Sequence, residues 1–181
     1  MKRLISLFVF ILPILGATGG AAALHAQDVA GLSLWGGPEA NGYSPTSMGF
    51  GGRVGEDYRF GERFSFGASV LLSDGSNFTT LEFSVNLRYY LFRDEGSLIK
   101  HFNRSAIFHF FVQAEGGAGV FFTEGNSPNA RLMGGIAAGS RIALSRFSSF
   151  YVEPYLRVGY PYLLGAGVLG VYRFPVKGVA W

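Results

Sequence analysis

The stretch TTLEFSVNLRYYLF, residues 79–92, alternates between apolar and polar side chains along its length. Its odd-numbered positions are mostly large and apolar: Thr79, Leu81, Phe83, Val85, Leu87, Tyr89 and Leu91. Its even-numbered positions include the polar residues Glu82, Ser84, Asn86 and Arg88. A period of two predicts a β-strand with one apolar and one polar face. The run is also longer than the usual strand of about five or six residues.

The same alternation predicts seven further strands at residues 29–36, 46–56, 63–72, 106–121, 130–144, 149–160 and 162–174. Turn-forming residues separate several of them, at 37–42, 73–77 and 124–129. Eight is an even number, as bacterial membrane barrels require. The pattern therefore predicts an all-β protein, an eight-stranded antiparallel up-and-down β-barrel.

Composition excludes several other classes of protein. The 181 residues are 49% hydrophobic and 15% charged, with 27 glycines and a net charge of +3. This charge is too small to indicate nucleic-acid binding. The absence of cysteine excludes disulfides, thiolate metal sites and cysteine nucleophiles. Beyond the N-terminal segment no apolar run is long enough for a membrane-spanning helix.

The N-terminal segment has the order of a secretory signal peptide. Three residues with two positive charges precede an apolar run at 4–15 and small residues at 16–23. Cleavage is expected after Ala23 or after Ala26, so residues 1–26 are assigned to the signal peptide and 27–181 to the barrel domain. The alternative is an uncleaved anchor formed by residues 4–24.

The placement of charge bears on whether the barrel lies in water or in lipid. Of the eleven Arg, Asp and Glu residues within the predicted strands, ten share the polar phase and Glu56 alone lies on the apolar phase. Strand length, the export signal and aromatic residues at the strand ends favour lipid on the outside, so the expected fold is a transmembrane β-barrel. We expect one aromatic rim at Phe60, Phe64, Phe92, Phe147, Phe150 and Phe174, and another at Trp35, Tyr43, Phe121, Phe122, Tyr160 and Tyr162. The alternative is an exported soluble sandwich or lipocalin-like barrel.

The segment Leu169-Gly170-Val171-Tyr172-Arg173-Phe174 is similar to the terminal assembly signal of small eight-stranded outer-membrane barrels. These form the class of the OmpA membrane domain, OmpX and OmpW. The resemblance implies a bacterial outer-membrane location, with both chain ends in the periplasm. It also implies that outer-membrane lipid, periplasmic chaperones and the barrel-assembly machinery are partners, the last reading Gly170, Tyr172 and Phe174. One departure is Pro154 within a strand, where we expect a β-bulge.

The inward phase carries the candidate functional residues, a lumen charge network. Counted from the strand ends, they fall into an upper layer of Glu82, Glu115 and Arg157 and a lower layer of Arg53, Arg88, His109, Arg141 and Glu153. Arg141 and Glu153 lie opposite each other across a turn and are expected to pair. Because the interior of an eight-stranded barrel can be filled by side chains, we expect the network to plug the lumen. The alternative is a narrow gated path in which the ion pairs exchange partners. Inward glycines, among them Gly165 and Gly167, are expected to leave room for large side chains from the opposite wall.

The expected function is that of a structural barrel or low-flux conduit. One alternative is an OmpW-like channel or transporter for a small hydrophobic solute; the other is a surface-exposed adhesin or ligand-binding barrel, which the short predicted outer loops disfavour. No enzyme, cofactor or metal site is expected. The GxGxxG match at 165–170 lacks the helix and acidic residue that a dinucleotide site needs. His101 and Ser105 lack an evident acidic partner for catalysis.

Overall fold

The computed structural model describes residues 29–60, 63–91, 107–123, 125–143 and 149–174. The expected signal peptide lies outside these residues, as do Phe92, His101 and Phe147. Eight strands account for nearly all of the described chain: β1 Val29–Ser44, β2 Ser47–Phe60, β3 Phe64–Gly75, β4 Phe78–Tyr90, β5 Ile107–Thr123, β6 Asn129–Ala143, β7 Phe150–Tyr160 and β8 Leu164–Arg173. No helix among these residues is long and apolar enough to cross a membrane.

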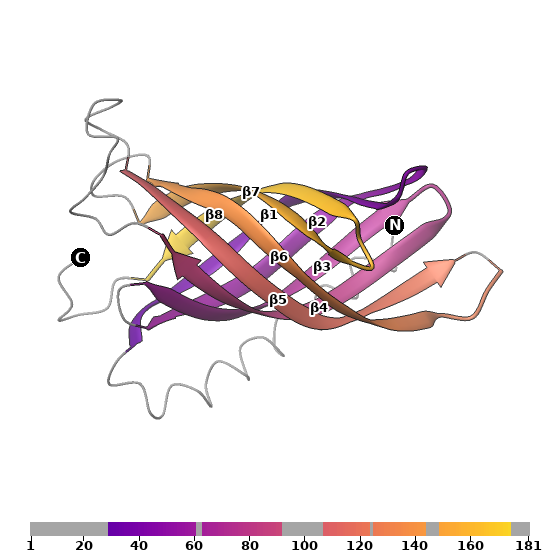
Figure 1. Ribbon diagram of the computed structural model, residues 1–181, viewed down its shortest axis with the longest axis horizontal. Helices are drawn as coiled ribbons and strands as arrows, with labels where there is room; N and C mark the ends of the chain where they lie inside the picture. Colours follow the sequence, from indigo (N-terminus) through magenta and orange to yellow (C-terminus); the bar gives the residue numbers. More distant parts are fainter. Residues whose placement is uncertain (1–28, 61–62, 92–106, 124, 144–148, 175–181) are drawn as a thin grey trace.

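The strands form a closed antiparallel barrel in which each strand pairs with the next and β8 pairs with β1 (Figure 1). The sequence-based prediction of an eight-stranded up-and-down barrel is thus confirmed. The hairpins β1–β2, β3–β4, β5–β6 and β7–β8 all turn at one end, which we call the hairpin end. The opposite end, where β1 begins and β8 finishes, is the terminal end. In Figure 1 the β5–β6 hairpin reaches farthest at the hairpin end.

The barrel is apolar outside and polar inside, and β4 shows this most clearly. Phe83, Val85 and Leu87 are 45%, 52% and 47% exposed, whereas Glu82 and Arg88 on either side of them are 1% and 2% exposed. A barrel in water has the opposite arrangement, because exposed apolar surface is unfavourable there. The outer face therefore requires an apolar environment, as in transmembrane barrels.

Aromatic residues gather on the outside at the terminal end. Phe60 stacks on Phe64 with ring centroids 5.8 Å apart, and Tyr172 lies 4.9 Å from Phe150 and 5.0 Å from Phe174. At the hairpin end the expected rim is partly wrong. Trp35 and Tyr162 are 4% and 0% exposed and lie inside the barrel, and the half-buried Tyr43 and Phe121 also point inward; only Phe122 and Tyr160 of this expected rim are exposed.

Residues 37–42 form part of strand β1, so the turn expected there is wrong. Their pairing with β2 is continuous from Gly37 opposite Arg53 to Asn41 opposite Gly49. Glycine and proline made this segment look like a turn, but Glu39 and Asn41 turn inward and bind arginines of the lumen. The turn itself lies at residues 45–46.

The bulge expected at Pro154 is also absent. The register between β7 and β8 runs without a shift from Phe150 opposite Tyr172 to Arg157 opposite Gly165. On the other side, the β6–β7 pairs stop at Gly139 opposite Tyr155 and resume at Ile142 opposite Val152. The missing proline N–H is therefore accommodated by a gap in one ladder rather than by an extra residue.

Candidate functional site

The inward-facing side chains bring nine charged residues together in the lumen, none more than 7% exposed. Seven of them are expected from the sequence: Arg53, Glu82, Arg88, Glu115, Arg141, Glu153 and Arg157. Glu39 and Asp57 are additional members. The nine residues form two groups, one toward each end of the barrel.

The cluster nearer the hairpin end is called the mouth-side cluster. It consists of Glu39, Arg53, Glu82, Glu115 and Arg157. Arg157 is its centre, because its Nη2 lies 2.7 Å from Glu39 Oε1 and 2.9 Å from Glu82 Oε2, while its Nη1 lies 2.9 Å from Glu115 Oε1. Arg53 Nη1 donates to Glu115 Oε2 at 3.1 Å, and its Nε lies 3.4 Å from Glu39 Oε2. Five strands supply these residues, so the cluster ties distant walls of the barrel together.

Each glutamate of the mouth-side cluster also accepts a hydrogen bond from a tyrosine hydroxyl. Tyr43 donates to Glu82 Oε1 at 2.9 Å, Tyr155 donates to Glu39 and Tyr162 donates to Glu115. The cluster holds three carboxylates against two guanidinium groups. Hydrogen bonds to an ionised acceptor are stronger than neutral ones, so the hydroxyls stabilise the surplus negative charge.

The terminal-side cluster consists of Asp57, Arg88, Arg141 and Glu153. Glu153 lies between the two arginines, because Arg88 Nη1 donates to its Oε2 at 2.9 Å and Arg141 Nε donates to its Oε1. Asp57 Oδ2 lies 3.2 Å from Arg88 Nη1 and 3.6 Å from Arg141 Nη2. Two positive and two negative charges therefore face one another within this cluster.

Gln113 connects the two clusters. Its Oε1 accepts from Arg88 Nε at 3.0 Å, and its Nε2 donates to Glu115 Oε2 at 3.4 Å. The buried side chain is thus a donor toward one cluster and an acceptor toward the other.

The expected division into layers is wrong for Arg53, which contacts Glu39 and Glu115 and belongs to the mouth-side cluster. Counting residues from the strand ends ignored the stagger between tilted strands, and this stagger shifts side chains along the barrel axis. His109 lies opposite Arg141 in the β5–β6 register and is half-buried.

Aromatic and apolar side chains fill the space around the charges. The Arg157 guanidinium lies 3.6 Å from the Tyr162 ring centroid, and that of Arg88 lies 4.1 Å from the Phe111 centroid. A buried apolar cluster completes the filling, made up of Trp35, Tyr90, Phe111, Ala137, Tyr155, Leu169 and Val171.

Inward glycines make room for these large side chains. An added Cβ at Gly167 would lie 2.7 Å from the Tyr155 ring, and one at Gly165 would lie 2.8 Å from Arg157 Cγ. In each case the large residue is the registered partner on the adjacent strand β7. The expectation that such glycines leave room for side chains from the opposite wall is therefore wrong at these two positions.

Sequence reasoning missed several of the residues that complete this site, among them Gln113 and Tyr43. Glu39 fell in the expected turn, Asp57 lay one residue beyond an expected strand, and Tyr155 and Tyr162 were not recognised as partners of glutamates. For Asp57 and Tyr155 a signal was available, since each continues the inward alternation of a charged residue, Arg53 or Glu153.

The three residues of the expected assembly signal share the outer face of β8. Gly170, Tyr172 and Phe174 alternate with the buried Leu169 and Val171 near the terminal end. Among the described residues, no group of three or more His, Cys, Asp or Glu could hold a metal ion.

Comparison with solved structures identifies the fold. The N-terminal β-barrel domain of Pseudomonas aeruginosa OprF matches with a TM-score of 0.51 and 12% identity, over 80% of this chain and 99% of that chain. Neisserial surface protein A, NspA, matches with a TM-score of 0.52 and 11% identity, over 81% of this chain and 96% of that chain. No family model and no curated protein matches the sequence. The chain has the fold of the small eight-stranded outer-membrane β-barrels.

Proposed function

We propose that this protein is an outer-membrane barrel whose lumen is closed by the two charged clusters, with a structural role or, at most, a low-flux conduit role. The observation that carries this proposal is the burial and mutual pairing of the nine lumen charges. An open aqueous channel would leave such groups hydrated, whereas each of these is at most 7% exposed.

The energetics of buried ion pairs also support a closed state. Opening a path would separate charges that lie in a low-dielectric interior, and leaving a buried charge without its partner costs about 3–5 kcal/mol. Arg157 contacts three carboxylates at once, so moving it would break several contacts together. The clusters thus favour a single, well-packed arrangement.

Location and partners are further parts of this proposal. The apolar outer face suits outer-membrane lipid, with the terminal end in the periplasm. Gly170, Tyr172 and Phe174 are proposed as the signal read by the barrel-assembly machinery, after delivery by periplasmic chaperones. We propose no catalytic role and no cofactor.

The two alternative functions have less support. A path for small hydrophobic solutes would have to cross the mouth-side cluster, which is charged. An adhesive surface usually needs long outer loops, whereas three connections at the hairpin end, residues 45–46, 76–77 and 161–163, have only two or three residues.

The proposal is tested by solute entry into vesicles. Refolded protein in lipid vesicles should give no swelling with a pentose sugar, whereas Glu115→Ala, which leaves Arg53 and Arg157 short of a partner, should give measurable swelling. Arg63→Ala, an exposed change at the terminal end, is the matched control and should stay silent. Swelling by the unaltered protein as fast as by Glu115→Ala would overturn the closed lumen.

A further inference from the structure

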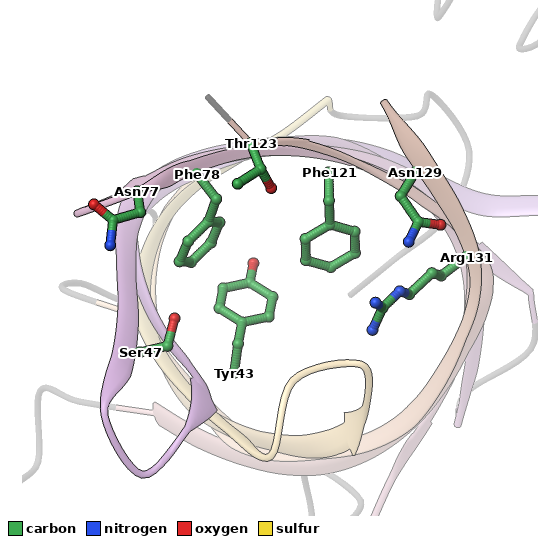
Figure 2. A pocket seen from close by; sticks show the side chains of 8 residues that line it. All are labelled: Tyr43, Ser47, Asn77, Phe78, Phe121, Thr123, Asn129 and Arg131. Atoms are coloured by element: carbon green, nitrogen blue, oxygen red, sulfur yellow. The ribbon is translucent and has the colours of Figure 1, made fainter. Parts of the chain in front are cut away.

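The hairpin end of the barrel holds an open cavity of about 260 Å³, and none of the nine charged residues of the lumen clusters lines it. Figure 2 shows the rings of Tyr43, Phe78 and Phe121 grouped inside the barrel wall, with Arg131 and Asn129 on one side and Asn77 on the other. Strands β1, β4, β5 and β6 and the connection between β3 and β4 contribute these groups. The cavity is therefore built by residues far apart in the sequence.

Three aromatic rings form the apolar part of the cavity. Tyr43 meets Phe78 edge to face with centroids 5.1 Å apart, and it meets Phe121 in the same way at 5.6 Å. All three rings are half-buried, so part of their surface still faces the cavity. Edge-to-face and offset contacts with such rings favour another flat aromatic group.

Among the described residues that line the cavity, Arg131 carries the only charge. Its guanidinium carbon lies 5.4 Å from the Phe121 ring centroid, which places the positive charge beside the aromatic surface. None of the carboxylates in the described part of the chain lies within ion-pair distance of it. A guanidinium group offers paired N–H donors that match a carboxylate.

We propose that this cavity binds a small aromatic carboxylate, whose ring packs against Tyr43, Phe78 and Phe121 and whose carboxylate pairs with Arg131. The cavity is smaller than the range of about 300–1,000 Å³ typical of drug-sized ligands, so a single-ring acid is the fitting size. Asn77 and Asn129 supply amide groups at the rim for substituents on the ring. The site lies above the lumen clusters and goes beyond the proposed function, because it requires no open pore.

The ring of Tyr43 and its hydroxyl group contact different parts of the structure. Its ring lines the cavity, while its hydroxyl donates to Glu82 at 2.9 Å and lies 3.1 Å from Ser73 Oγ.

The test is an NMR titration of refolded, isotope-labelled protein in detergent micelles with benzoate. Saturable binding is expected, with shifts concentrated at Arg131, Phe121 and Tyr43. Benzamide, which has the ring without the charge, and acetate, which has the charge without the ring, should each bind about tenfold or more weakly.

Variants at two exposed arginines provide the matched comparison. Arg131→Gln should lower benzoate affinity by about tenfold, whereas Arg63→Gln at the terminal end should leave it unchanged. Equal losses in both variants, equal binding of benzamide and benzoate, or no saturable binding would each overturn the proposal. Tighter binding of glucuronate than of benzoate would also overturn it, in favour of a site for sugar acids.

Discussion

Glu153 lies between two arginines in the lumen. It is fully buried, and it accepts hydrogen bonds from Arg88 and Arg141 on two different strands. Both arginines also contact Asp57, but Asp57 alone would have to balance two positive charges if Glu153 were removed. The lumen charges therefore act as a group, because each charged side chain offsets the free-energy cost of burying its oppositely charged neighbour.

Replacement of Glu153 by Ala is expected to lower the free energy of unfolding by about 3–5 kcal/mol, because it leaves a buried guanidinium group without its partner. The measurement is urea unfolding of the protein refolded in lipid vesicles, followed by tryptophan fluorescence. Arg63→Ala is the control and should change stability by less than about 1 kcal/mol, since Arg63 is exposed. A loss of under 1 kcal/mol for Glu153→Ala would show that the terminal-side cluster does not stabilise the fold.

At the scale of strands, the barrel fits large inward side chains by placing glycine opposite them in the register. Tyr155 lies opposite Gly139 on one side and Gly167 on the other. Trp35 lies opposite Gly55, where an added Cβ would come within 2.5 Å of the indole ring. A long side chain can then lie across the neighbouring strand and reach the middle of the lumen.

Replacement of Gly167 by Val is expected to displace Tyr155 and weaken its bond to Glu39. The overlap should lower the free energy of unfolding by about 1–3 kcal/mol, the usual cost of overpacking. Ala166→Val is the matched control, because Ala166 is the adjacent residue and is exposed on the outer face. Urea midpoints that fall equally for both variants would count against this packing rule.

The strands could be predicted from the sequence because alternation is a local property, read from one segment at a time. The strand at residues 37–42 could not be predicted, because the composition of this segment is typical of a turn. Pairing with β2 and contacts to Arg53 and Arg157 hold the segment as a strand. Most charged members of the site were found by phase alone. The pairing of Arg141 with Glu153 was also predicted, and the structure confirms it. Other contacts were not predicted, because the contact of Arg53 with Glu115 depends on the stagger between strands, and Tyr162 turns inward only after the chain bends at Pro161.

At the scale of the whole molecule, apolar side chains lie on the outside of the barrel and charged side chains inside, the reverse of the arrangement in a protein surrounded by water. Phe66, Val85, Leu132, Ile136 and Leu156 are exposed on the outer wall, while the paired charges lie inside. A hydrocarbon environment removes the cost of the exposed apolar surface, and backbone pairing around the closed sheet leaves no strand edge in lipid. The closed barrel is therefore suited to lipid, and lipid in turn stabilises its apolar outer wall.

A charge placed on the outer wall tests this orientation. Val85→Arg is expected to lower the free energy of unfolding of the protein in lipid vesicles by about 2–4 kcal/mol, the cost of arginine facing the middle of the bilayer. Ser76→Arg, in the exposed connection between β3 and β4, should change it by less than about 0.5 kcal/mol. Equal effects of the two changes would mean that Val85 does not face lipid.

The most direct test of the closed lumen is the single-channel conductance of the refolded protein in a planar bilayer at neutral pH. The unaltered barrel should show no stable steps, and Glu115→Ala should show brief openings in the same membrane, because Arg53 and Arg157 both lose contacts. Stable, long-lived steps in the unaltered protein would contradict the account and make the lumen a conducting pore.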